Sequence, residues 1–124
     1  MNRRVLVIGP DLEFVFWVCR ALDQSGCEAF PARSVEAAAE TVSEFHVSPN
    51  LVILTAHLPD AANLIASLRQ AQENLRVVRL AGLGEEDGMT VDGVHPRPAD
   101  RTEKAKAELL KVVCHAWERQ PISH

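Results

Sequence analysis

Two short runs of consecutive apolar residues constrain the fold of this chain more than any other feature. They occupy positions 5–8 (VLVI) and 51–54 (LVIL), and a glycine or a threonine directly follows each run. A strand that is apolar at every position is buried on both faces, which is typical of a parallel sheet covered by helices on both sides. The two runs therefore predict central strands of such a sheet.

Segments with helical spacing of apolar residues alternate with these and other strand-like runs. The predicted strands are 5–8, 27–32, 51–54, 75–82 and 94–96, and the predicted helices are 12–25, 35–45, 60–74 and 104–118. Strands that alternate with helices predict an α/β domain with a parallel sheet. In the helix over 35–45, the apolar face at helical period ends with Phe45.

Capping residues precede three of the predicted helices. Asp11 and Ser34 stand before the first and second helices, and Asp100 with Glu103 matches a capping box before the last. We expect Asp11 to cap the helix that follows it.

The prolines of two predicted strands indicate the order of the sheet. Pro31 and Pro96 have no N–H group to donate, so the second and fifth strands are expected at the edges. That placement matches the doubly wound, flavodoxin-like order 2-1-3-4-5 of a five-stranded parallel sheet. In this order the ligand crevice lies at the carboxyl ends of the first and third strands, at positions 9–11 and 55–57.

Composition narrows the classes of function. The 124 residues suit one domain, with 1–119 as the domain and 120–124 as a tail or linker stub. A net charge of −4 without a basic stripe argues against nucleic-acid binding. Three scattered cysteines and five scattered histidines give no metal-ligand pattern. Without a signal peptide or a long apolar run, we expect a cytoplasmic protein that does not enter membranes.

Four segments, taken in order, resemble the receiver domain of two-component response regulators over nearly the whole chain. They are RVLVIGPD, SPNLVILTAHLP, VVRLAG and VHPRP. The resemblance implies a site in which Mg²⁺, held by an acidic pair, assists phosphoryl transfer to an aspartate. A Thr or Ser and a Lys complete that site.

Each family position carries a different residue here. The acidic pair falls on Gly9 and Pro10, the phosphoacceptor on Thr55, the Thr or Ser on Ala81, and the Lys on Arg97. Gly9 and Pro10 offer no side-chain oxygen to a hard cation, and a threonine without a neighbouring base is a weak nucleophile. We therefore expect a pseudo-receiver that uses neither a metal nor a cofactor, is not phosphorylated on aspartate and is not an enzyme.

Two other functions remain open from the sequence. The chain could be an atypical response regulator modified at Thr55 or His57. It could also be a small-molecule-binding protein of flavodoxin-like topology that uses the crevice at Gly9, Thr55 and Arg97. The segment between Ala81 and Arg97 is about one and a half helical turns shorter than the family pattern, so we expect the family's fourth helix to be short or missing.

The helix over 12–25 carries more apolar residues than one buried face needs. One face at helical period would cover the sheet, and it comprises Phe14, Trp17, Val18, Ala21 and Leu22. A second stripe comprises Leu12, Val15, Phe16 and Cys19, and the last helix could extend it with Leu110, Cys114 and Trp117. Apolar residues outside the core predict an interface, so we expect a protein partner or a homodimer there, although Trp117 could equally pack inside.

Overall fold

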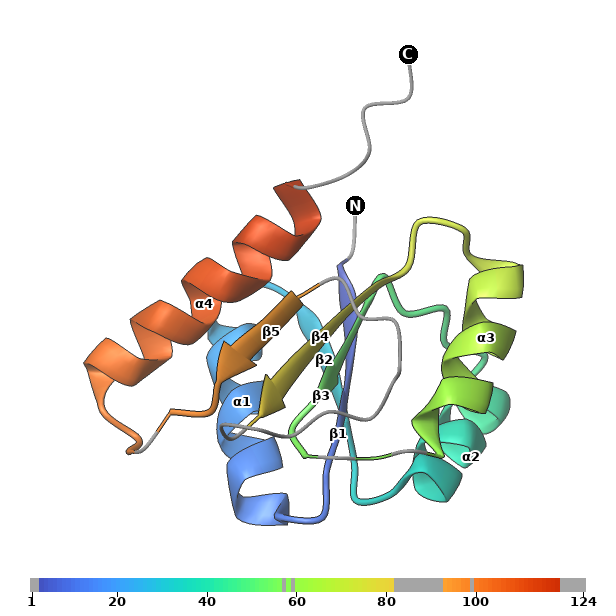
Figure 1. Ribbon diagram of the computed structural model, residues 1–124, viewed down its shortest axis with the longest axis horizontal. Helices are drawn as coiled ribbons and strands as arrows, with labels where there is room; N and C mark the ends of the chain where they lie inside the picture. The colour runs from blue at the N-terminus through green and yellow to red at the C-terminus, as the bar shows by residue number, and fades with distance from the viewer. Residues whose placement is uncertain (1–2, 57, 59, 82–92, 99, 119–124) are drawn as a thin grey trace.

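The chain forms a five-stranded parallel sheet with helices on both faces. The computed structural model describes residues 3–56, 58, 60–81, 93–98 and 100–118 (Figure 1). The strands are β1 (Arg4–Ile8), β2 (Glu28–Ala32), β3 (Leu51–Leu54), β4 (Arg76–Ala81) and β5 (Gly93–Pro96), and the helices are α1 (Leu12–Gln24), α2 (Val35–Phe45), α3 (Ala61–Ala71) and α4 (Glu103–Glu118). The α4 of the structure is the predicted helix over 104–118.

The strand order is β2-β1-β3-β4-β5, as the two prolines predicted. Pro31 lies in edge strand β2 opposite Val7, and Pro96 ends edge strand β5 opposite Ala81. All five strands are parallel, so their carboxyl ends meet at one edge of the sheet (Figure 1). The flavodoxin-like prediction is confirmed.

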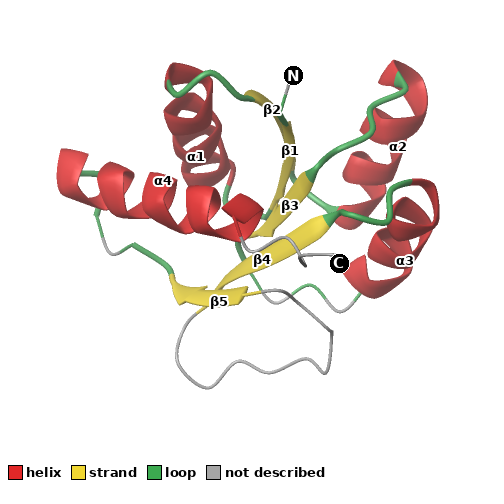
Figure 2. Ribbon diagram, turned by 90° about the horizontal axis from the view of Figure 1, so that it is seen from above, coloured by secondary structure: helices red, strands yellow, loops and turns green. Residues whose placement is uncertain are grey.

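Two apolar layers sandwich the sheet. Helices α1 and α4 cover one face, and α2 and α3 cover the other (Figure 2). Side chains of β1 alternate between the layers, so that Val5 and Val7 face α1 while Leu6 and Ile8 face α2 and α3. Because all four are fully buried, the continuous apolar run of this strand is explained by the sandwich.

Local capping follows the sequence at two helices and departs from it at a third. The Asp11 carboxylate accepts the N–H of Phe14, and the Ser34 hydroxyl accepts the N–H of Ala37 at 3.1 Å. At α4 the predicted Asp100 cap is wrong, because the Thr102 hydroxyl accepts the N–H of Ala105. Asp100 instead accepts hydrogen bonds from the N–H and hydroxyl of Thr102, which orients the residue that caps the helix.

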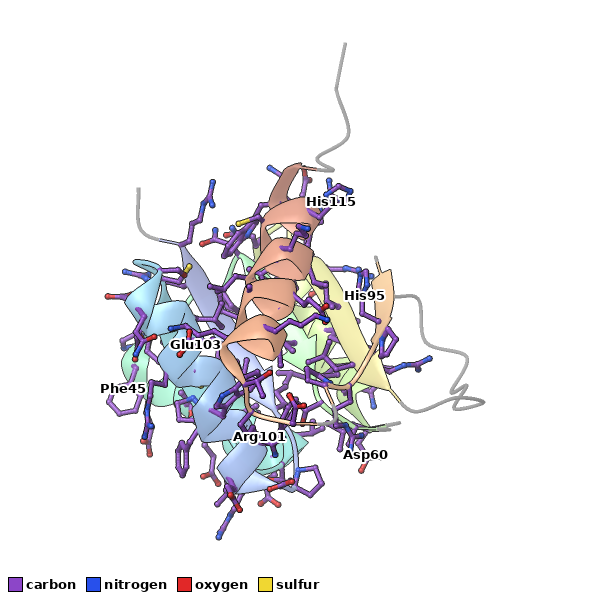
Figure 3. The ribbon with its side chains drawn as sticks, turned by 90° about the vertical axis from the view of Figure 1, so that its left-hand side faces the viewer. Phe45, Asp60, His95, Arg101, Glu103 and His115 are labelled. Atoms are coloured by element: carbon purple, nitrogen blue, oxygen red, sulfur yellow. The ribbon has the colours of Figure 1, made fainter. Side chains whose placement is uncertain are left out.

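Phe45 ends the apolar stripe of α2 but does not lie in the core. Its side chain is 68% exposed and points away from the body of the molecule (Figure 3). The helix ends there because His46 adopts the left-handed conformation at φ 51°. The turn brings Val47, not Phe45, into the core, with the Val47 N–H donating to the Val42 carbonyl.

Other predictions fall on residues that the structure does not describe. The shortened or missing fourth helix would lie within 82–92, and the tail 120–124 lies beyond the last described residue. Both stay predictions. Within the described part of the chain, no helix is long and apolar enough to span a membrane.

Candidate functional site

Thr55 lies at the centre of the candidate site, where β3 ends beside β1. Its backbone N–H donates to the Ile8 carbonyl at 2.9 Å, which continues the pairing between the two strands. Its hydroxyl donates to the same carbonyl at 3.1 Å. Only 2% of Thr55 is exposed, so the hydroxyl lies inside the strand ends rather than in an open crevice.

Gly9 leaves the space that the Thr55 side chain occupies. A Cβ atom built on Gly9 would lie 1.7 Å from Thr55 Oγ1 and 3.1 Å from Thr55 Cβ. Real Cβ atoms do not approach a heavy atom so closely, so a side chain at position 9 and the present position of Thr55 exclude each other. The first acidic position and the phosphoacceptor position of the resemblance are therefore in direct contact here.

The described residues at positions 9–11 and 55 do not suit Mg²⁺. Gly9 and Pro10 supply no side-chain oxygen, and the Thr55 hydroxyl is directed at a backbone carbonyl. Asp11, the nearest carboxylate in the sequence, caps α1 through the N–H of Phe14 at 3.3 Å. Mg²⁺ demands several oxygen ligands in octahedral geometry, and this donor set does not provide them. Among the described residues, no group of three or more His, Cys, Asp or Glu could hold a metal ion.

The other predicted site positions lie at the ends of β4 and β5. Ala81 pairs with Pro96, and Arg97 follows directly after β5, so the strand register brings these positions to the same edge as Thr55. Arg97 is exposed and lines a groove of about 300 Å³ between β5 and α4. His57 lies outside the described residues.

A second depression at this edge was not predicted. It has a volume of about 360 Å³, and its described lining comprises Pro10, Arg33, Ser34, Val35, Glu36, Leu58 and Asp60. It shares no described lining residue with the Arg97 groove, so these two depressions at the carboxyl edge are separate among the described residues. Nothing in the sequence distinguishes Arg33 from any other loop residue.

Arg79 is a buried charged residue within β4. It is 5% exposed, and it pairs in register with Leu54 of β3. Because Val78 and Leu80 face α1 and α4, alternation places Arg79 on the opposite face, with α2 and α3. The side chain is therefore enclosed on this face of the sheet.

The exposed apolar surface of α1 is narrower than the sequence predicted. Val15 and Cys19 are buried at 0% and 7% exposure, because α1 packs along β2 as well as β1. Leu12 and Phe16 remain exposed, at 36% and 50%. Burial, reinforced by the charge of Asp23, raises the pKa of the Cys19 thiol to about 12.

The three α4 residues predicted to extend the interface also differ in exposure. Trp117 is 9% exposed and packs in the layer between α1, α4 and the sheet. The guanidinium of Arg3 lies 4.6 Å from the centre of its ring. Leu110 is half-buried and Cys114 is exposed, so only these two of the three predicted α4 positions reach solvent.

A pair of stacked aromatic rings on α1 is contacted by a residue that lies just before α4. The rings of Phe14 and Trp17 stack with centroids 5.8 Å apart. Arg101, just before α4, places its guanidinium 4.7 Å from the centre of Phe14 and 5.6 Å from that of Trp17. Lys106 of α4 also contacts the side-chain amide oxygen of Gln24. The stripe of α1 that carries Phe16 is thus distinct from the side of α1 that faces α4.

Comparison with known proteins identifies the fold. No protein-family model and no curated protein sequence matches the chain. A response regulator receiver domain from Methanospirillum hungatei matches with a TM-score of 0.75 at 15% identity, covering 97% of each chain. The chemotaxis regulator CheY4 of Vibrio cholerae matches with a TM-score of 0.73 at 15% identity, covering 94% of this chain and 99% of that one.

A third solved structure gives the same result. The receiver domain of AraT from Geobacillus stearothermophilus has a TM-score of 0.70 at 18% identity and covers 96% of this chain and 95% of its own. The matches span almost the whole chain. The protein therefore has the fold of a response-regulator receiver domain.

Proposed function

We propose that this protein is a receiver-like signalling module that acts by binding protein without aspartyl phosphorylation. The observation that carries the proposal is the contact between Thr55 and Gly9. The Thr55 hydroxyl occupies the place that a side chain at position 9 would need, and it is hydrogen-bonded to the Ile8 carbonyl. The residues at the phosphorylation position thus hold two strands together rather than reacting.

Phosphorylation of Thr55 itself is disfavoured for the same reason. A hydroxyl acts as a nucleophile when a base removes its proton and the reacting group can reach it. The Thr55 proton is directed at a backbone carbonyl, and the residue is 2% exposed. A phosphoryl group on Thr55 would have to displace this hydrogen bond and the packing around Gly9.

The exposed apolar residues support a role in protein contacts. Leu12 and Phe16 on α1 are large side chains that remain accessible, and Leu110 and Cys114 reach solvent on α4. Leu12 and Phe16 are four residues apart on one helix and so adjoin one another, and adjoining exposed apolar residues mark interaction sites more often than isolated ones do. In this proposal the domain works in the cytoplasm, catalyses no reaction and needs no cofactor.

Fluoroberyllate titration tests the proposal. Amide spectra of ¹⁵N-labelled protein would be recorded with Mg²⁺ alone and with Mg²⁺ and fluoroberyllate, and intact mass would be followed with acetyl phosphate. We expect no saturable shift at residues 8–11 and 54–56 and no mass gain of one phosphoryl group. A receiver domain with intact acidic residues, treated in parallel, shows that the reagents work.

A restored variant makes the test sharper. Gly9→Asp/Pro10→Asp/Thr55→Asp returns carboxylates to three positions and removes the Thr55 side chain that excludes one of them. If the wild-type protein binds fluoroberyllate with Mg²⁺, or gains a phosphoryl group on Thr55 or His57, the proposal is wrong. If only the folded variant responds, the loss of response in the wild type is due to these positions.

A further inference from the structure

The outward stripe of α1 combines exposed apolar and charged residues. Leu12 is 36% exposed and Phe16 is 50% exposed, and Glu13 and Arg20 are exposed beside them. At 100° per residue these four side chains lie within about 100° of one another around the helix axis. Most buried residues of α1 lie on the opposite side, against the sheet and α4, while buried Cys19 borders the stripe next to Leu12 and exposed Asp23 lies within it. The stripe is therefore one continuous surface.

Opposite charges flank Phe16 at nearly equal distances along the helix. Glu13 is three residues before Phe16 and Arg20 is four residues after it, which corresponds to about 4.5 Å and 6 Å along the axis. Two copies of α1 packed antiparallel about a two-fold axis near Phe16 would place the two Phe16 rings together. Glu13 of each copy would then lie opposite Arg20 of the other, at both ends of the contact.

We infer that α1 forms an antiparallel, two-fold self-association contact centred on Phe16. The inference rests on the proposed role in protein contacts but not on the loss of phosphorylation. A parallel pairing would align Glu13 with Glu13 and Arg20 with Arg20, so charge favours the antiparallel one. The methylene chain of Arg20 would cover Leu12 of the other copy while its guanidinium reaches Glu13.

The contact is expected to be weak. One helix face buries less than the roughly 1,200 Å² in total that stable interfaces exceed. Such an interface forms transiently, or strengthens when a longer chain or scaffold raises the local concentration. Self-association should therefore depend on concentration up to about 1 mM, a range in which weak complexes become populated.

Charge reversal can identify this pairing. Sedimentation velocity and NMR translational diffusion would be measured for the wild type, Glu13→Arg, Arg20→Glu and an equimolar mixture of these two variants. Each variant alone faces like charges across the two-fold axis and should lose association by about five-fold or more. In the mixture, the arginine introduced at position 13 of one chain would meet the glutamate introduced at position 20 of the other. The native pair would form at the far end of the contact, so association should return.

Matched aromatic variants control for general effects. Phe16→Asp should abolish self-association, whereas Phe45→Asp should not, because Phe45 is also exposed but lies on α2 across the sheet. Circular dichroism must show that each variant is folded. A wild type that remains monomeric at about 1 mM would overturn the inference, and so would a mixture no better than its components. Neither result affects the outcome of the fluoroberyllate test, so the inference and the proposed function can fail separately.

Discussion

Replacing Gly9 with alanine tests the contact on which the proposed function depends. The added methyl group would lie 1.7 Å from Thr55 Oγ1, so Thr55 must rotate or the strands must separate. Gly9 does not have a positive φ angle, unlike Gly26, so alanine meets no backbone penalty at this position. Any loss of stability therefore comes from the collision with Thr55.

The cost can be estimated from the two interactions that are disturbed. Moving the Thr55 hydroxyl breaks a buried hydrogen bond, worth about 1 kcal/mol, and overpacking a dense region costs about 1–3 kcal/mol. Gly9→Ala should thus destabilise the protein by about 2–4 kcal/mol. In a Thr55→Ala background the hydroxyl is absent, and the remaining neighbours lie at 3.1 and 3.4 Å. There the same change should cost about 1 kcal/mol or less.

Urea denaturation of the four proteins of this double-mutant cycle measures the coupling. We expect an interaction free energy of about 2 kcal/mol between positions 9 and 55. Gly26→Ala is the matched control, since its φ is +94° and nothing lies within 4 Å of the added methyl group. It should cost about 1 kcal/mol through backbone strain and be additive with Thr55→Ala. If the losses of unfolding free energy caused by Gly9→Ala and Thr55→Ala are also additive, the steric reasoning is wrong.

Three further changes have defined outcomes. His46→Gly should raise the free energy of unfolding by about 1 kcal/mol in denaturant titrations, because φ 51° strains a residue with a side chain. Burial first, and then the charge of Asp23, raise the pKa of Cys19 from 9.0 to about 12, so the neutral thiol is favoured in the fold. The stability of the wild type relative to Cys19→Ala should therefore be constant below pH 9 and fall between pH 9 and 12. Arg101→Ala should cost about 0.5–1 kcal/mol and shift Trp17 fluorescence, whereas Arg101→Lys should lose less.

The architecture could be predicted because it depends on local patterns that act over few residues. A four-residue apolar run is too short for a helix, so 51–54 indicates a buried strand without knowledge of its neighbours. Pro31 and Pro96 lack the donor that a central strand needs, and this chemical fact alone places their strands at the edges. Ser34 caps a helix through its own hydroxyl, again by local chemistry.

The exposed residues of α1 could not be predicted as well, because burial on a helix depends on how much of the helix its neighbours cover. Spacing alone divides the apolar residues of α1 into two stripes. In the structure β2 extends the covered surface, so Val15 and Cys19 join the core while Phe16 does not. The edge between buried and exposed positions is set by a neighbouring strand that follows the helix in the chain, and the spacing within the helix carries no information about it.

The contact at the candidate site was also beyond prediction from the sequence, because it joins residues far apart in the chain. From the sequence, Gly9 and Thr55 are two separate departures from a family pattern, 46 residues apart. In the structure they are one contact, since the hydroxyl of one fills the space that the other leaves empty. An acidic side chain at position 9 would have to displace Thr55 and its hydrogen bond to the Ile8 carbonyl. The two departures therefore stabilise each other, and the strand ends that they join are expected to stay together whether or not a phosphodonor is present.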